Sequence, residues 1–265
     1  MTEAQRSSVA EPVTRRVDGA VAIITLDNPG RLNPLSGEAI ELLITQLEEL
    51  ERNELIRVVI LAATGKAFSA GHDLKEMRTM DRSAHEHLFA RCSKLMLTIN
   101  RQPQPVIAQV QGLATAAGCQ LVGACDLAVA AESARFAVSG INVGLFCSTP
   151  AVALSRNVTP KRAFEMLVTG DFIDAPTAKA CGLINDVVPD DELPPATLAL
   201  AQKIAAKPPL ALRMGKQLFY EQLGLDLEAA YERAGEVMAC NMDSQDARAG
   251  IDAFFDKVTP VWTGR

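Results

Sequence analysis

FSAGHDL, residues 68–74, and GLATAAGCQL, residues 112–121, are the two stretches that decide the fold. Each follows a short apolar run rich in β-branched residues, at 58–61 and 106–110, and each leads into residues that can begin a helix. A strand that turns directly into a helix leaves the first amides of that helix without intrahelical partners. Two such amides directed at one point can stabilise a developing oxyanion. The pattern therefore predicts a pair of backbone donors where two strands end.

Strands and helices alternate along most of the chain, which favours an α/β fold with a mostly parallel sheet. Extended segments are expected at 13–17, 20–26, 57–62, 106–110, 127–130 and 184–188. Helices are expected from Ser36 to about 52, and at 81–100, 116–125, 160–168 and 176–181. From 190 onward the pattern is helical, with breaks at Pro208-Pro209 and Gly224. We expect a disordered tail over 1–12, a core over 13–200 and a helical region over 201–265.

Composition excludes several classes of function. The net charge of −6 gives no reason to expect a nucleic-acid partner. No apolar run approaches the roughly 18 residues of a membrane span, and the first residues lack the apolar segment of a signal peptide. The six cysteines show no paired metal-ligand spacing, so we expect no metal site and buried free thiols. Free thiols are typical of a reducing compartment, and we expect the cytoplasm.

Both glycine-bearing stretches resemble the signatures of the crotonase superfamily, the enoyl-CoA hydratase/isomerase family. Residues 68–75 match F-x-[AS]-G-x-D-[LI]-x, and residues 112–126 match the second signature with substitutions. The resemblance covers residues 13–262. It implies a spiral of ββα units, followed by helices that support a homotrimer or a dimer of trimers. It also implies an acyl-CoA substrate, with coenzyme A as part of that substrate and no tightly bound cofactor. The oxyanion donors would be the backbone N–H groups of His72 and Ala117.

The family's two proton-transferring glutamates have no counterpart in this sequence. The first glutamate aligns with Gln120, which we expect to line the pocket near the acyl carbons. Its amide can orient a water molecule but cannot exchange a proton near neutral pH. The second aligns with Gly140, which has no side chain. Some naphthoate synthases of the family also have glycine there and bind bicarbonate, an arrangement that Gly140 permits. Ordinary hydratase activity is therefore doubtful.

Other residues near the two turns are candidates to replace the glutamates. The imidazole of His72 can titrate near neutral pH, although packing is the more common role of a lone histidine. Asp73 is expected to cap a helix, and His85 and His87 to lie on a solvated surface. The expected acyl pocket includes Ser139, Asn142, Phe146 and Cys147. Cys147 is either a nucleophile with a depressed pKa or an unreactive thiol of the pocket wall.

The coenzyme A end of the ligand is expected at three places. The stretch NPGRLN, residues 28–33, resembles a family loop that contacts the nucleotide, with Arg31 and Leu32 as candidates and Lys75 as a second cation. Phe254 and Lys257 match positions that reach the nucleotide of a neighbouring subunit. For each basic residue, a solvated surface charge is an equally good interpretation.

Three hypotheses of function remain. The chain is a crotonase-fold enzyme that is not an efficient hydratase, a hydratase or isomerase of low rate, or a non-catalytic acyl-CoA binder or assembly partner.

Overall fold

A six-stranded sheet forms the centre of the chain in the computed structural model, which describes residues 11–265. Residues 1–10, most of the expected tail, lie outside the described residues. The strands lie in the order β1 (Val13–Asp18), β2 (Val21–Leu26), β3 (Val58–Ala63), β5 (Val106–Val110), β7 (Leu127–Ala131) and β10 (Asp186–Val188). The first two form an antiparallel hairpin, and all later neighbours are parallel. The predicted α/β class with a mostly parallel sheet is confirmed.

A second, smaller sheet stands beside the first. Its order is β4 (Ala67–Ser69), β6 (Leu113–Thr115), β8 (Arg135–Ala137) and β9 (Ile173–Asp174). The strands β4, β6 and β8 each follow a strand of the large sheet after a short turn, and each is followed by helical residues. This repetition is the expected spiral of ββα units. The strands β4, β6 and β9 were not predicted, because two or three residues are too few to show an alternating pattern.

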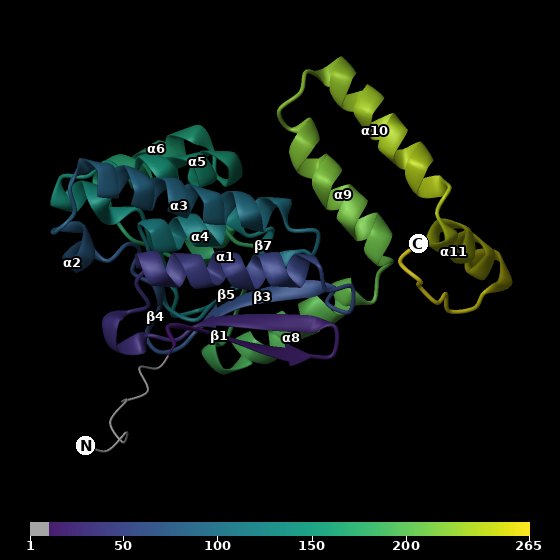
Figure 1. Ribbon diagram of the computed structural model, residues 1–265, viewed down its shortest axis with the longest axis horizontal. Coiled ribbons are helices and arrows are strands. Elements are labelled where there is room, and N and C mark those ends of the chain that lie inside the picture. The colour runs from purple at the N-terminus through teal and green to yellow at the C-terminus, as the bar shows by residue number, and fades with distance from the viewer. Residues whose placement is uncertain (1–10) are drawn as a thin grey trace, which may run out of the picture.

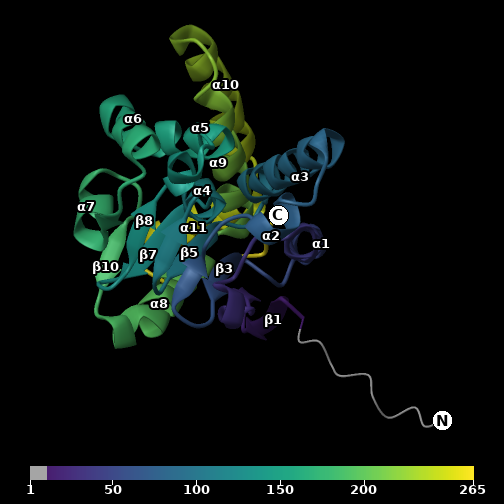
Figure 2. The same ribbon diagram turned by 90° about the vertical axis from the view of Figure 1, so that its left-hand side faces the viewer.

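Helices cover both faces of the large sheet. On one face lie α1 (Gly37–Glu51), α3 (Arg82–Arg101) and α4 (Ala117–Ala124), and on the other lies α8 (Leu193–Ala205) (Figures 1 and 2). Side-chain caps begin the two long helices: Ser36 Oγ accepts from Ala39 N at 3.2 Å, and Asp81 Oδ1 accepts from Ala84 N at 2.8 Å. Each helix buries an apolar stripe, such as Leu88, Leu95 and Ile99 of α3. Burial of these stripes against the sheet is the main stabilising contribution.

The remaining helices before residue 190 are short. They are α2 (Leu74–Met77), α5 (Ser148–Asn157), α6 (Pro160–Thr169) and α7 (Ala175–Ala180), with 3₁₀ turns η1 (Pro29–Arg31) and η2 (Ser139–Val143), and η3 (Asp190–Glu192) follows β10. The helix α5 was not predicted. Within residues 11–265, no helix has the length and apolar composition that a bilayer crossing requires.

Three C-terminal helices stand away from the α/β part of the chain (Figure 1). They are α9 (Pro209–Gln222), α10 (Leu227–Met242) and α11 (Gln245–Asp256). The expected boundary between 200 and 201 falls inside α8, whose Leu193, Ala201 and Ala205 pack against the large sheet. The separate helical unit thus begins at α9. It exposes many large apolar side chains: Phe219, Leu223, Leu225, Leu227, Tyr231, Met238, Met242, Ile251, Phe254 and Phe255.

A buried polar cluster fastens α9 to the core. Lys216 Nζ donates to the Asp126 carboxylate at 2.6 Å and to the backbone oxygens of Ile99 and Gln104 at 3.0 and 3.2 Å. Tyr220 donates to the other oxygen of Asp126 at 2.8 Å. Burial lowers the pKa of Lys216, and the neighbouring Asp126 acts in the opposite direction. Because every donor and acceptor of this cluster has a partner, it fixes the angle at which α9 leaves the core.

The C-terminal residues fold back onto α11. Asp246 is buried, and its carboxylate accepts from Thr263 N at 2.6 Å, Thr263 Oγ1 at 3.0 Å and Gly264 N at 2.9 Å. Trp262 Nε1 donates to Ala206 O at 2.9 Å, just beyond α8. The chain end therefore holds α11 against the junction of α8 and α9.

Candidate active site

The two glycine-bearing turns meet at one point. Gly71 has φ of +85°, which favours glycine, and a Cβ placed on it would lie 3.0 Å from Ala117 N. The same Cβ would lie 3.0 Å from Thr115 O, so the first turn is packed directly against the second. A side chain at 71 would force the turns apart. Because Gly71 has no side chain, the two turns can pack closely, and residues 72 and 117 lie near each other.

Both candidate amides are free of the sheet and helix ladders. Leu35 pairs with His72 in a parallel bridge, and Leu35 N donates to Gly71 O at 2.8 Å. In such a bridge the N–H of the bridged residue itself points away from its partner. Ala117 is the first residue of α4, so its N–H has no intrahelical acceptor. Both residues line the same cavity.

The turn before α4 holds a non-glycine residue in an unfavourable conformation. Ala116 has φ of +50° and ψ of −120°, and its N–H donates to Ala137 O at 3.0 Å. A residue with a Cβ in such a region costs on the order of 1–3 kcal/mol, which the surrounding structure must offset. The methyl group of Ala116 lies in the cavity wall.

The cavity itself has a volume of about 340 Å³ and carries no charged side chain at neutral pH. Apolar side chains from α2, α3 and the η2–α5 segment form much of its wall: Leu74, Met77, Phe89, Val143, Leu145 and Phe146. The polar side chains are Ser139, Cys147, Ser148, Thr149 and His72. Among the described residues that line it, none is acidic and none is Lys or Arg. Leu74, Met77 and Phe89 were not identified from the sequence, because nothing in their spacing separates a pocket wall from a core.

His72 is neutral at pH 7. Burial lowers the pKa of its imidazole to about 4. The ring meets the edge of Phe89 at 5.5 Å, and Nε2 is buried without a hydrogen-bond partner among residues 11–265. His85 differs from expectation, because it is half-buried, stacks on Phe89 and lies 2.9 Å from Met77 O. His87 is exposed.

Asp73 is not among the residues that line the cavity, and it caps α2. Its carboxylate accepts from Lys75 N at 3.0 Å and Glu76 N at 3.4 Å, the expected capping role, and it pairs with the Arg31 guanidinium. Arg31 therefore already has an anionic partner in this structure, which the sequence did not indicate because 42 residues separate the pair. Lys75 is exposed on α2. Leu32 is 41% exposed, with φ of +61°.

The two positions at which we expect the family glutamates to be missing differ in their surroundings. Gln120 is 5% exposed, does not line the cavity, and its Oε1 has no hydrogen-bond partner among the described residues. Gly140 does line the cavity. A Cβ on Gly140 would lie 2.7 Å from Cys147 Sγ and 2.7 Å from Leu145 O. These distances are far shorter than an ordinary van der Waals contact. Atoms of the segment 140–147 therefore occupy the space that a side chain at 140 would need.

The other expected pocket residues divide between wall and surface. Ser139, Phe146 and Cys147 line the cavity, whereas Asn142 is exposed and lies beside Gly170. Burial raises the pKa of the Cys147 thiol, and a hydrogen bond from the Gly140 backbone acts in the opposite direction. The thiol is therefore protonated at neutral pH, contrary to what a nucleophile needs.

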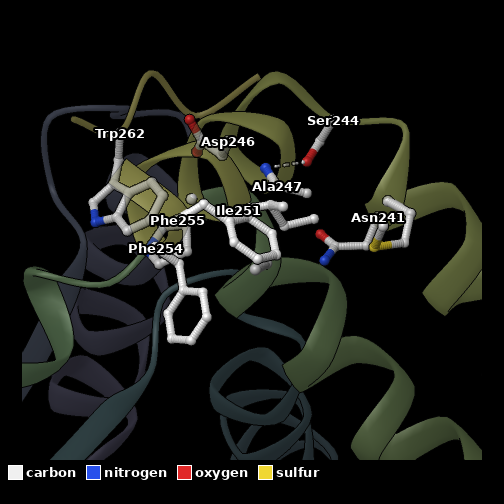
Figure 3. Close-up of a pocket in the computed structure, with 12 residues that line it drawn as sticks. Asn241, Ser244, Asp246, Ala247, Ile251, Phe254, Phe255 and Trp262 are labelled. Carbon is white, nitrogen blue, oxygen red and sulfur yellow. Dashed lines mark hydrogen bonds between the residues drawn. The ribbon is translucent and has the colours of Figure 1, made fainter. Parts of the chain in front are cut away.

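Phe254 and Lys257 lie on and just after α11, and neither lines the cavity beside His72. Phe254 and Phe255 are 78% and 75% exposed. They border a second, mostly apolar cavity of about 410 Å³, together with Ile251 and Trp262 (Figure 3). Within one chain, the residues expected to contact the nucleotide of a neighbouring subunit thus lie on the C-terminal helices, away from the cavity beside His72.

The fold and the cavity define a class: a spiral of ββα units with a cavity at the meeting point of two strand-to-helix turns, lined by no acidic residue, Lys or Arg among the described residues. The family model described as enoyl-CoA hydratase/isomerase matches residues 16–265. The chain belongs to this family.

Relatives agree with this assignment. Mouse (Mus musculus) enoyl-CoA hydratase domain-containing protein 3, mitochondrial, is 45% identical over 251 residues, 94% of this chain and 83% of the relative. The human protein of that name has a crystal structure that matches with a TM-score of 0.93 at 44% identity, covering 95% and 100% of the two chains. A crystal structure of an enoyl-CoA hydratase from Mycobacterium smegmatis matches with a TM-score of 0.93 at 54% identity, covering 95% and 98%. The stretches at 112–121 and 142–150 resemble the branch of domain-containing protein 3, and these comparisons confirm that resemblance.

Proposed function

We propose that this chain is an acyl-CoA thioester-binding enzyme that polarises the thioester carbonyl with His72 N–H and Ala117 N–H, and that it is not an efficient hydratase. The observation that carries the second part is the space at Gly140. A glutamate there would collide with both Cys147 Sγ and the Leu145 carbonyl. In this structure the site therefore has no room for that carboxylate.

The proposed chemistry combines two backbone donors with a cavity in which no charged side chain is found among the described lining residues. Negative charge that develops on the thioester oxygen is stabilised by the two N–H groups, which are fixed before the reaction begins. Few other charges compete, because His72 is neutral and Cys147 is protonated. Proton transfer would then depend on water, on a bound anion or on the substrate itself. Loss of a general acid or base typically costs 10²–10⁴-fold in rate, so hydration of an enoyl-CoA should be slower by several orders of magnitude.

Assembly forms part of the proposal. The apolar side chains exposed on α9, α10 and α11 support a homotrimer or a dimer of trimers, since contiguous exposed apolar surface marks an interaction site. In such an assembly Phe254 and Lys257 would reach the nucleotide end of coenzyme A bound to a neighbour, while Arg31, Leu32 and Lys75 would serve the same end within the chain. All six cysteines are free, which supports a reducing compartment, and we propose the cytoplasm.

The decisive experiment measures binding and turnover of a panel of CoA thioesters (enoyl, hydroxyacyl and malonyl types) with the parent protein and with Ala117→Pro. Proline removes one donor, so acyl-CoA binding and any turnover should fall sharply. Circular dichroism checks that the variant is folded.

Four results are informative. Crotonyl-CoA hydration at the rate of a two-glutamate relative would refute the proposal. Slow hydration or isomerisation would favour the second hypothesis, and binding without turnover of any thioester would favour the third. If folded Ala117→Pro binds and converts ligand as well as the parent, the site lies elsewhere.

A further inference from the structure

We infer that a pair of hydroxyl groups, Thr115 Oγ1 and Ser139 Oγ, determines specificity for an acyl group that carries a hydroxyl close to the thioester carbonyl. The two oxygens, called the hydroxyl pair below, lie 2.8 Å apart. The inference rests on the proposed function, because it concerns the acyl group held in the same cavity.

The small sheet places the hydroxyl pair beside the candidate amides. Strands β6 and β8 are parallel, with Thr115 opposite Ala137, and Ser139 begins η2 two residues later. Thr115 is two residues before Ala117, whose N–H is a candidate oxyanion donor, and Ser139 directly precedes Gly140. The pair therefore bridges the second glycine-bearing turn and the segment where a hydratase glutamate would stand.

The hydroxyl pair has one hydrogen bond to spare. Two hydroxyls bring two protons, and their mutual bond uses one of them. Neither oxygen has another hydrogen-bond partner among residues 11–265. Ser139 lines the cavity, while Thr115 is 8% exposed and does not. If Thr115 donates to Ser139, Ser139 can donate to a ligand; if Ser139 donates to Thr115, its lone pairs can accept from one.

A ligand hydroxyl is the group that fits both arrangements, because it can donate and accept. An anionic acyl group fits poorly, since the described lining contains no Lys or Arg and His72 is neutral. A plain hydrocarbon acyl group could not form the remaining hydrogen bond of the hydroxyl pair, and the cavity around the pair is mostly apolar. An unused buried polar group is costly, so the pair discriminates in favour of hydroxyacyl thioesters.

The test compares dissociation constants, measured calorimetrically, for butyryl-CoA, 2-hydroxybutyryl-CoA, 3-hydroxybutyryl-CoA and malonyl-CoA. One net hydrogen bond between neutral groups corresponds to roughly a fivefold change in affinity. The parent should bind at least one hydroxybutyryl-CoA about fivefold more tightly than butyryl-CoA, and malonyl-CoA most weakly. Ser139→Ala should bring the hydroxyl preference to within about twofold, because the hydroxyl that distinguishes the two kinds of thioester is gone. Chromatography after each titration shows whether the ligand is intact.

Two further variants complete the test. Thr115→Val should lose part of the preference for hydroxybutyryl-CoA over butyryl-CoA. This variant replaces Ser139→Ala in the test if Ser139→Ala does not fold. Ser155→Ala is the matched control, because Ser155 lies exposed on α5, outside the cavity lining, with its hydroxyl 3.4 Å from Val152 O.

Equal binding of butyryl-CoA and both hydroxybutyryl-CoAs by the parent would overturn the inference and leave the proposed function standing. If both Ser139→Ala and Thr115→Val keep the preference for hydroxybutyryl-CoA, the inference is also overturned and the proposed function still stands. If no thioester binds, the proposed function fails and the inference fails with it.

Discussion

Gly140→Ala should destabilise the protein, although the change adds a single methyl group. The new Cβ would lie 2.7 Å from Cys147 Sγ and 2.7 Å from Leu145 O. The sulfur can rotate away, but Leu145 O belongs to the backbone, so the segment 140–147 must move. Overpacking of this kind typically costs about 1–3 kcal/mol. Urea denaturation followed by circular dichroism at the helix band measures the free energy of unfolding.

The control for this prediction is the same substitution at an open position. Gly30 is exposed, its φ is not positive, and a Cβ there would meet no atom within 4 Å. Gly30→Ala should therefore be neutral or stabilising by about 0.4–1 kcal/mol, through the reduced entropy of the unfolded chain. In a double-mutant cycle, adding Cys147→Ala to Gly140→Ala should recover part of the loss, because one of the two collisions disappears. Gly140→Ala with the stability of the parent would refute the argument that segment 140–147 excludes a side chain at 140.

Four other outcomes are expected. Ala116→Gly should raise the free energy of unfolding by roughly 0.5–2 kcal/mol, the strain of a positive φ less the extra entropy of glycine; a lower value in denaturant titration contradicts this. His72 takes up a proton near its usual pKa of 6.5 when unfolded but only near 4 when folded, so stability should fall from pH 6.5 to pH 4, by up to about 3 kcal/mol, and His72→Gln should flatten that profile. Cys147 should react with iodoacetamide at pH 7.5 far more slowly than the exposed Cys240, as peptide mass spectrometry can establish, because burial raises its pKa. Asp246→Ala should let carboxypeptidase remove the C-terminal residues faster, since three hydrogen bonds to the chain end are lost.

The long elements of the fold could be predicted because their signals are local. The strand at Val106–Val110 was predicted with its observed bounds, and Ser36 and Asp81 marked the starts of α1 and α3. The helix α5 was missed because its first residues, Ser148, Thr149 and Pro150, resemble a loop, and its place depends on packing against α4 and α6. Strands of two or three residues exist only because a neighbouring strand pairs with them.

The features of the site that depend on backbone conformation could be predicted from the sequence. Those that depend on the direction of a side chain were harder to predict. Gly71 indicated the meeting of the turns, since its conformation is encoded locally. The expectation that Gln120 faces the acyl group depended on the rotation of α4 about its axis, which spacing alone does not give. The Arg31–Asp73 pair and the Thr115–Ser139 pair each join distant segments, so a single sequence offers no sign of them.

Trp262 gives the protein an intrinsic optical probe of its C-terminal helices. It is the one tryptophan of the sequence, and its indole bonds to Ala206 O while its ring lies close to Gly250 of α11. Emission excited at the tryptophan band therefore originates beside α11, with no tryptophan signal from the α/β core. A shift in emission at a lower urea concentration than the loss of helical dichroism would mean that the C-terminal helices detach before the core unfolds. Dilution experiments read by the same emission could test, without any added label, whether the proposed trimer forms and dissociates.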